Sequence, residues 1–380
     1  MTTPIATAPQ VRPDAVAPIE LAALETPVPI VDLERMERNL DRVADYAAAH
    51  GLGLRPHIKT HKTPWIAAEQ LARGAIGLTC ATAFEAEVMS AVANDLLVAY
   101  PPVTPARIAR LLALPHDADV MVALDSGEAI ERLAAGAREA DRPMRVLIEL
   151  DVGMGRVGLP DADDGVALAE LVRQRPPLVY AGIAFYPGHI REPVDRQDTA
   201  LAALAARLRD TLGSFERAGV TPEVVSGGST PTLYRTHELP GVTEFRPGTY
   251  VFNDRTTAAV GACAWEDCAL TVAATIVSTA IPGQAVIDAG SKALGREPLG
   301  GDGEGFGALR DHPDVSVSAM SEEHGILDLG DGGWRPRVGD MVHVVPNHVC
   351  IVVHLNDVIF GARGDVVERR WKVEARGRGY

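Results

Sequence analysis

One short run of the sequence places a lysine between two histidines at alternate positions. It covers residues 55–62 and reads RPHIKTHK. Because side chains alternate between the two faces of an extended chain, His57, Lys59 and His61 are expected on one face and Lys62 on the other. A lysine desolvated among histidines loses part of its preference for the charged form, and a neutral amine can attack an aldehyde. Lys59 is therefore a candidate for covalent catalysis, with a solvated basic loop as the alternative interpretation.

A second candidate site lies near the end of the chain, where one residue separates His348 from Cys350. On a strand, this spacing would place imidazole and thiolate on one face, where both can bind one divalent metal. Two ligands alone are a weak signal, and two residues packed in a strand are the alternative. The other cysteines, Cys80, Cys263 and Cys268, form no C-x-x-C pair, so neither a redox motif nor a zinc finger is indicated.

Segments that combine glycine with polar residues follow other apolar runs. They are residues 151–156, which contain Arg156, residues 186–189, which begin with Tyr186, and residues 226–230. The last segment includes Gly228, Ser229 and Thr230. Glycine lets the backbone approach a ligand closely and the hydroxyls can donate hydrogen bonds, which suits a phosphate group. A plain glycine turn is the alternative for this segment.

The elements that must position these residues are short apolar segments alternating with alanine-rich, helix-like segments. This order predicts a parallel (β/α)8 barrel, with an open doubly wound sheet as the competing arrangement. Barrel enzymes hold their catalytic groups at the carboxyl ends of the strands, which is where the lysine run and the glycine segments fall. The predicted strands are residues 28–31, 54–59, 76–79, 96–100, 120–124, 146–150, 179–185 and 224–226.

The pattern of residue types along the chain changes after residue 250. Short valine-rich segments, among them residues 341–345 and 349–353, are separated by Gly, Pro and Asp rather than by helices. This pattern predicts a second, mostly antiparallel β domain that carries the metal pair, with residues 300–305 as a loop. The predicted division is an N-terminal arm over residues 1–22, the barrel over residues 23–250 and the β domain over residues 251–380.

Composition restricts the class of protein. The 380 residues carry a formal net charge of −15, which argues against nucleic acid and anionic membranes as partners. No apolar stretch is long enough to span a bilayer, and the N-terminus lacks the order of a signal peptide. A cytoplasmic location is therefore expected.

Several segments, in this order along the chain, resemble the D-threonine aldolase and D-serine dehydratase family. The resemblance implies the alanine-racemase-like fold, in which an N-terminal barrel holds pyridoxal 5′-phosphate (PLP) and a β domain follows. It also implies a divalent metal near the cofactor and a homodimer. The segments that carry it are residues 55–62, 151–158, 226–232, 246–252, 321–325 and 346–350.

The resemblance assigns roles in cofactor binding residue by residue. Lys59 matches the lysine that forms the covalent link with PLP. Arg156 matches an arginine that contacts the oxygen on the cofactor ring, and Tyr186 matches a neighbour of the cofactor. The phosphate group is assigned to Gly228, Ser229 and Thr230.

The resemblance also assigns His348 and Cys350 to the metal, and the thiolate favours zinc, with manganese and magnesium as alternatives. Aldolase members carry aspartate at the position of Cys350, whereas dehydratase members carry cysteine. Aldolases also have a second histidine shortly after the equivalent of His189, and residues 188–193 read GHIREP here. We therefore expect a lyase that dehydrates D-serine or another 3-hydroxy-D-amino acid to a 2-oxo acid and ammonia. Retro-aldol cleavage to glycine and an aldehyde is the alternative.

Other interpretations stay open from the sequence. Arg191 could pair with a second substrate carboxylate, as in 3-hydroxyaspartate, or be a solvated loop arginine. Single-domain relatives of the barrel bind PLP without a known turnover reaction, although the β domain and the metal pair argue against that role. A racemase shares the fold, but the sequence offers no second catalytic acid or base of the tyrosine type.

Overall fold

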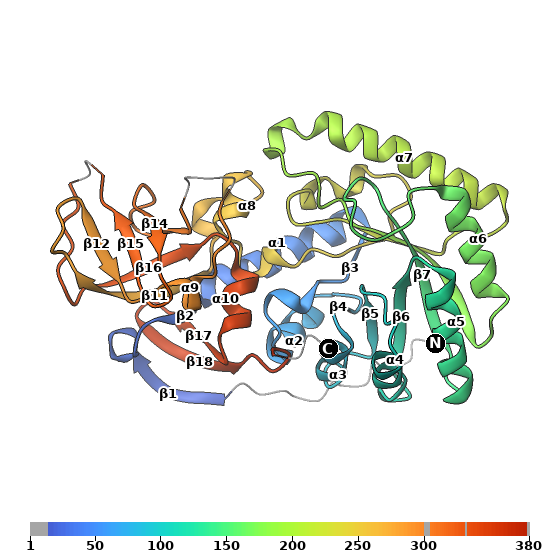
Figure 1. Cartoon of the computed structure of the whole chain (residues 1–380), viewed down its shortest axis with the longest axis horizontal. Coiled ribbons are helices and arrows are strands. Elements are labelled where there is room, and N and C mark those ends of the chain that lie inside the picture. Colours follow the sequence, from blue (N-terminus) through green and yellow to red (C-terminus); the bar gives the residue numbers. More distant parts are fainter. Residues whose placement is uncertain (1–13, 300–304, 331–332, 378–380) are drawn as a thin grey trace.

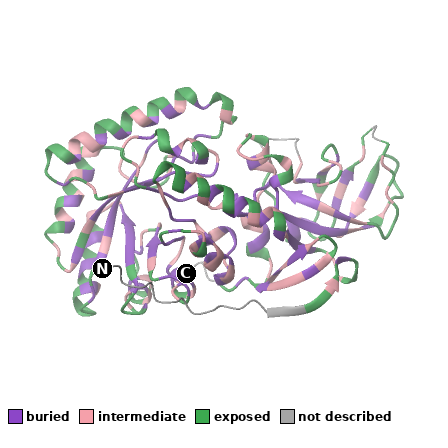
Figure 2. Cartoon of the chain, turned by 180° about the vertical axis from the view of Figure 1, so that it is seen from behind, coloured by how far each residue is buried: buried purple, intermediate pink, exposed green. Residues whose placement is uncertain are grey.

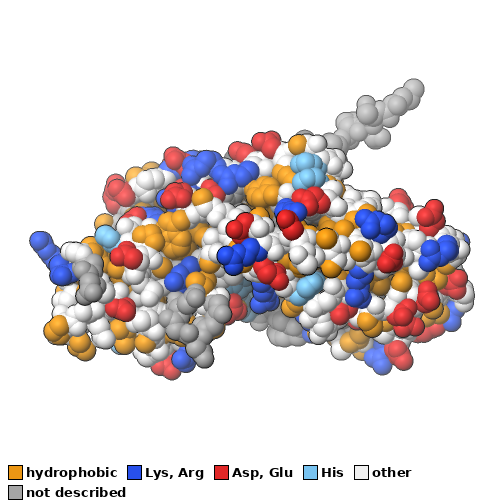
Figure 3. Space-filling model, turned by 90° about the horizontal axis from the view of Figure 1, so that it is seen from above, with side chains coloured by type: hydrophobic (Ala, Val, Ile, Leu, Met, Phe, Trp, Pro, Cys, Tyr) orange, Lys and Arg blue, Asp and Glu red, His pale blue; other side chains and the backbone are white. Residues whose placement is uncertain are grey.

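Two domains lie side by side along the long axis of the molecule (Figure 1). The computed structural model describes residues 14–299, 305–330 and 333–377. Most of the predicted glycine-rich loop, residues 300–304, and the first 13 residues of the predicted arm lie outside this range. Within the described residues, no helix is long and apolar enough to cross a membrane. Basic and acidic side chains are interspersed on the face seen from above (Figure 3).

The first domain is the predicted barrel of parallel strands. Its sheet runs in the order β3-β10-β9-β8-β7-β6-β5-β4, and a parallel bridge between His57 and Thr79 joins its two ends. Apolar side chains such as Met121 and Leu147 fill its interior. The strands are β3 (Gly53–Leu54), β4 (Leu78–Cys80), β5 (Asp95–Val98), β6 (Asp119–Leu124), β7 (Met144–Leu150), β8 (Leu178–Phe185), β9 (Val224–Gly227) and β10 (Glu244–Phe245).

Helices cover the outside of the barrel, burying one face against the strands and exposing the other (Figure 2). At the start of several helices, a hydroxyl or carboxylate side chain accepts a hydrogen bond from a backbone N–H group. Thr82, Ser126 and Asp161 are examples. The helices are α1 (Leu33–His50), α2 (Pro64–Ala72), α3 (Ala83–Met89), α4 (Pro105–Leu112), α5 (Gly127–Glu139), α6 (Ala162–Arg173) and α7 (Asp198–Arg217).

The second domain is a mostly antiparallel sheet that closes on itself because β11 pairs with both β12 and β16. Short helices α8 (Arg255–Ala259), α9 (Ser291–Leu294) and α10 (Val349–Leu355) accompany it. Its strands are β1 (Asp14–Glu20), β2 (Val28–Asp32), β11 (Leu270–Ser278), β12 (Gln284–Ile287), β13 (Gly307–Leu309), β14 (Ser316–Met320), β15 (Gly325–Asp328), β16 (Met341–Pro346), β17 (Val358–Arg363) and β18 (Val366–Lys372).

Two of the predicted strands discussed here were wrong, and one barrel strand was not predicted. Residues 28–31 were expected in the barrel, but β2 pairs with β11 and β17 of the second sheet. The eighth barrel strand is instead β10, which is only two residues long and has no periodicity to reveal it. Residues 349–353 form the helix α10 rather than a strand, because Val349, Val352 and Val353 are all buried and follow helical spacing.

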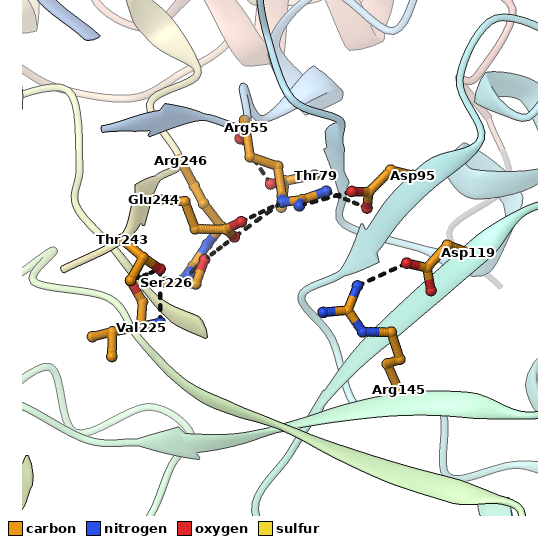
Figure 4. Close-up of polar contacts among 10 residues, drawn as sticks. All are labelled: Arg55, Thr79, Asp95, Asp119, Arg145, Val225, Ser226, Thr243, Glu244 and Arg246. Carbon is orange, nitrogen blue, oxygen red and sulfur yellow. Dashed lines mark hydrogen bonds and ion pairs between the residues drawn. The ribbon is translucent and has the colours of Figure 1, made fainter. Parts of the chain in front are cut away.

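A chain of buried ionic contacts crosses the inside of the barrel where its shortest strands meet (Figure 4). Nε of Arg55 lies 2.9 Å from both carboxylate oxygens of Glu244, and the other end of its guanidinium contacts Asp95. Glu244 also accepts the hydroxyl of Ser226, which in turn accepts a hydrogen bond from Arg246. Gly77 leaves the space that the Arg55 guanidinium fills. The contacts therefore connect β5, β9 and β10 with Arg55, the residue that directly follows β3.

We expect Arg55→Met to lower the free energy of unfolding by about 3–5 kcal/mol, because it removes the guanidinium that pairs directly with the buried carboxylate of Glu244. Arg145→Met is the matched control, since its ion pair with Asp119 is largely exposed and should contribute at most about 1 kcal/mol. Urea titration followed by circular dichroism measures both. Equal losses in the two variants would contradict a special role for the buried pair.

His61 is fully buried, and its imidazole is neutral. Its Nδ1 accepts the backbone N–H of Thr63, so Nε2 carries the proton that faces Oε1 of Gln70 at 3.2 Å. Gln70 in turn donates to the hydroxyl of Tyr250. Burial lowers the pKa of His61 from 6.5 to about 3.

This depressed pKa predicts acid sensitivity. Between pH 6.5 and about 3 the unfolded chain binds a proton that folded His61 does not, so stability falls as pH falls through this window. The slope from this group is about 1.4 kcal/mol per pH unit. His61→Gln, which keeps a polar partner for Gln70, should lose that part of the slope in urea titrations at pH 7 and pH 4.5. Identical slopes in the two proteins would refute the assignment.

Candidate active site

A cavity of about 790 Å³ opens at the carboxyl ends of the barrel strands, where the barrel meets the second domain. Residues that follow β3, β8, β9 and β10 form one side, and residues of α8 and the second domain form the other. This is the end of a barrel at which enzymes hold their catalytic groups. The polar lining residues are His57, Lys59, Tyr186, Arg191, Ser229, Thr230, Arg246, Thr249, Asp254, Thr256, Thr257, Glu297 and His348.

The lysine run bends instead of continuing β3. Residues Ile58–Thr60 form a 3-10 turn, so the expected alternation of side chains is wrong. Lys59 and His57 line the cavity, whereas His61 points into the protein and Lys62 pairs with the buried carboxylate of Glu85. Burial and the charge of Lys59 lower the pKa of His57 well below its ordinary value, so this imidazole is neutral at pH 7. Of the two lysines in the run, Lys59 is the one at the cavity.

The segment after β9 has the geometry of an anion site. Gly228 has a φ of +89°, in the region that favours glycine, and turns the chain so that Ser229 and Thr230 line the cavity. Within the described part of the chain, the backbone N–H groups of Ser229 and Thr230 have no hydrogen-bond acceptor. Donors left open beside a cavity suit a phosphate group.

Arg156 reaches the site through Tyr186. Its guanidinium carbon lies 5.0 Å from the centroid of the Tyr186 ring, and the tyrosine lines the cavity. The loop before Arg156 is held by Asp151, whose carboxylate accepts three backbone N–H groups, from residues 153, 154 and 155. Arg156 itself is exposed and is not part of the cavity wall.

His348 and Cys350 lie together, although not on a strand. His348 caps α10 and Cys350 lies in its first turn. Nδ1 of His348 is 3.1 Å from Oδ2 of Asp254, while Sγ of Cys350 is 3.4 Å from Oγ1 of Thr60 in the Lys59 turn. Burial alone would raise the pKa of the Cys350 thiol, but the charge of His348, a hydrogen bond from it and the charge of Lys59 lower it.

The donor set of this pair suits a metal. Because Asp254 binds Nδ1 of His348, Nε2 is left for coordination, an arrangement common in metal sites. The charge of His348 that lowers the pKa of Cys350 belongs to the protonated imidazole, and a bound metal would take the place of that proton beside the thiolate. Within the described residues, no group of three or more His, Cys, Asp or Glu side chains is placed to hold a metal, so the protein supplies two donors here.

Two site residues were not singled out from the sequence. Arg246, quoted only within a longer motif, is buried and lines the cavity, donating to Ser226 and to the carbonyl of Phe185. It follows β10, the strand that periodicity could not reveal. Asp254 was also missed, and its position at the start of α8 is a capping signal that could have drawn attention to it.

Two further residues of the catalytic types, His189 and Lys292, do not line the cavity. His189 rests against Gly153 and does not line the cavity. Lys292, which is 67% exposed, pairs with Glu323 on the surface of the second domain.

Comparison with known protein families divides the chain at the same place as the two sheets. Residues 31–256 match the family described as "Alanine racemase, N-terminal domain", and residues 269–362 match the "Putative serine dehydratase domain".

Named relatives and solved structures cover nearly the whole chain. A D-threonine aldolase of Arthrobacter sp. is 32% identical, with 94% of each chain covered. A D-threo-3-hydroxyaspartate dehydratase of Delftia sp. is 36% identical over 87% of this chain and 92% of the relative. The crystal structure of D-threonine aldolase from Filomicrobium marinum aligns with a TM-score of 0.87 at 32% identity, covering 97% of this chain and all of the other. The chain belongs to the PLP-dependent D-threonine aldolase and D-serine dehydratase family, which has the alanine-racemase-like fold and whose named members are lyases.

Proposed function

We propose that the protein is a PLP- and metal-dependent dehydratase that converts 3-hydroxy-D-amino acids to 2-oxo acids and ammonia. The observation that carries the proposal is the pair His348 and Cys350 beside the turn that carries Lys59. A thiol in place of a carboxylate, together with the lack of a second histidine after His189 in residues 190–193, favours dehydration over aldol cleavage.

The cavity residues fit PLP. Lys59 would hold the cofactor covalently, the open amides and hydroxyls of Ser229 and Thr230 would bind its phosphate, and Arg156 with Tyr186 would border its ring. When bound, PLP supplies an electron sink for negative charge at the substrate Cα. The cationic groups on the wall suit both an anionic cofactor and an anionic substrate.

His348 and Cys350 would hold a divalent metal, with Asp254 orienting the imidazole through Nδ1. Such a metal supplies Lewis acidity toward the hydroxyl on the substrate β-carbon. Zinc is the favoured metal because thiolate and imidazole are the ligands it prefers, while manganese and magnesium are the alternatives.

We assign the transfer of the substrate Cα proton to Lys59. Its amine lines the cavity next to neutral His57 and is the group placed to take the proton from the substrate Cα. Retro-aldol cleavage would instead need a base at the β-hydroxyl. His189 rests on Gly153 and residues 190–193 contain no second histidine, so this segment after β8 offers no such base.

The relatives supply further support. The solved structures of the Delftia D-threo-3-hydroxyaspartate dehydratase include a histidine-to-alanine variant and a cysteine-to-alanine variant at positions two apart, the latter metal-free. His348 and Cys350 have the same spacing.

D-threonine-aldolase-type cleavage remains the second candidate, because the aldolases of Arthrobacter and Filomicrobium are as similar to this chain as the dehydratase structures are. A role in PLP binding without turnover is the third. A homodimer is also part of the proposal, on the resemblance of the sequence to the family, as is the cytoplasmic location expected from the sequence.

Lys59→Ala should abolish the near-visible absorption band that PLP shows when it is joined to a protein amine, because this substitution removes the joining nitrogen. Lys292→Ala is the matched control and should keep the band, since Lys292 lies on the surface of the other domain. A band that persists in Lys59→Ala would transfer the role to another lysine.

The wild-type protein loaded with zinc should release ammonia and a 2-oxo acid from D-serine, D-threonine or 3-hydroxy-D-aspartate. Cys350→Ala should lower bound zinc and reduce kcat by at least about 100-fold, because it removes one of two protein donors. Cys80→Ala, in the barrel core, should keep both the metal and the activity. Glycine and an aldehyde as the products would make the protein an aldolase whose metal site contains cysteine.

A further inference from the structure

Arg191 is a cation on the cavity wall that the chemistry described above does not use. It follows β8 in the loop that begins with Tyr186, and it lines the cavity together with Tyr186 and Gly188. Nε of Arg191 donates to the carbonyl of Gly188 at 2.9 Å, which fixes the direction of the guanidinium. The backbone N–H of Arg191 donates to the carboxylate of Glu192.

The loop that carries Arg191 is held on both sides. Ile190 is fully buried, and the side-chain amide of buried Gln197 donates to the carbonyls of Glu192 and Pro231. The N–H of Val194 donates to the carbonyl of Val260, which also lines the cavity. Arg191 is therefore presented by an anchored wall, which lowers the entropic cost of using it to bind a ligand.

The terminal nitrogens of Arg191 have no partner within the described part of the chain. Neither a hydrogen bond nor an ion pair is formed by them, whereas Arg246 on the same wall is bonded to Ser226 and Phe185. The carboxylate of Asp254, also on the wall, is occupied by His348 and Thr257. A guanidinium with two free, parallel N–H groups is the geometry that binds a carboxylate in bidentate fashion.

A substrate amino acid has an α-carboxylate, but the position of Arg191 fits a different group. The α-carboxylate is attached to the same carbon as the nitrogen that PLP would receive, so it lies close to Lys59. Arg191 is one of the exposed residues of the cavity, whereas Lys59, Ser229 and Thr230 are more deeply buried. A cation at the open end of the cavity faces the far end of a substrate, which is its side chain.

We propose that Arg191 is a specificity-determining residue that binds the side-chain carboxylate of an acidic substrate, so that 3-hydroxy-D-aspartate is preferred to D-serine. The inference rests on the proposed function for its reaction, although the binding step can be measured separately. The expected bond is a bidentate, charge-assisted pair between the guanidinium and the carboxylate on the substrate β-carbon.

The first measurement compares kcat/KM for 3-hydroxy-D-aspartate and D-serine in the wild type, Arg191→Met and Arg191→Lys. Arg191→Met should lower the value for 3-hydroxy-D-aspartate by about 100-fold and leave that for D-serine within about 3-fold, because only the acidic substrate loses a charged partner. Arg191→Lys, which keeps the charge without the bidentate fork, should fall between them. Arg196→Met is the matched control, since Arg196 is an exposed arginine of the same loop that does not line the cavity.

The second measurement is the affinity for D-aspartate and D-alanine, which lack a β-hydroxyl to eliminate. Binding is detected as a change in the absorbance of the PLP-loaded protein. Arg191→Met should raise the Kd of D-aspartate by about 100-fold and leave that of D-alanine unchanged. If no substrate is dehydrated but this selective loss is found, the dehydratase proposal fails and the role of Arg191 stands.

Equal losses for acidic and neutral ligands in both measurements would overturn the inference, because they would place Arg191 at the α-carboxylate. No loss for either ligand would also overturn it and leave Arg191 as a surface arginine. Circular dichroism spectra and thermal midpoints that match the wild type establish that each variant is folded.

Discussion

The seam of the barrel at β3 and β10 is the constraint on which the rest of the site depends. Each of these strands has two residues, and only two residue pairs join them in register. So short a ladder contributes little stability by itself. Arg55, which follows β3, adds ion pairs with Glu244 on β10 and with Asp95 on β5. Lys59 follows β3 and Arg246 follows β10, so the positions of both cavity residues depend on this one buried cation.

The path of the chain between the two domains explains how distant residues meet at the cavity. β1 and β2 belong to the second sheet, the chain then builds the whole barrel, and it returns to the second sheet at β11. The chain therefore crosses between the domains twice, once just before the barrel segment begins and once just after it ends. Asp254, just after the barrel, reaches His348, and Thr60 in the barrel reaches Cys350. His348 and Cys350, the predicted metal ligands, lie beside the Lys59 turn because of these crossings.

Much of this arrangement was predictable from local pattern and resemblance, and the exceptions have physical causes. The alternation of strands and helices predicted the barrel, and the cavity receives Lys59, Tyr186, Ser229 and Thr230 as expected of residues that follow its strands. Pairing between strands is a tertiary property, so an apolar run such as β2 gives no sign of which sheet it joins.

Other exceptions lie in the turns that place the site. Residues 58–60 turn instead of extending, which brings Lys59 to the cavity and turns His61 away. The run of valines in α10 favours a strand by propensity, but the burial of one helical face overrides it. In both places a predicted residue, Lys59 or His348, lines the cavity although the backbone around it differs from the prediction. The conformation of such a short segment depends on what packs against it, which local pattern does not reveal.

The electrostatics of the cavity oppose those of the whole molecule. The protein carries a net charge of −15, yet its cavity wall combines Lys59, Arg191 and Arg246 with two carboxylates, Asp254 and Glu297. Asp254 is already bonded to His348, so its negative charge is largely compensated within the protein. A locally cationic cavity in an acidic surface attracts small anions while the surface repels extended ones, because fields focus in a cleft with low-dielectric walls. A phosphate-bearing cofactor and an amino acid with one or two carboxylates are ligands of this kind, and a polyanion is not.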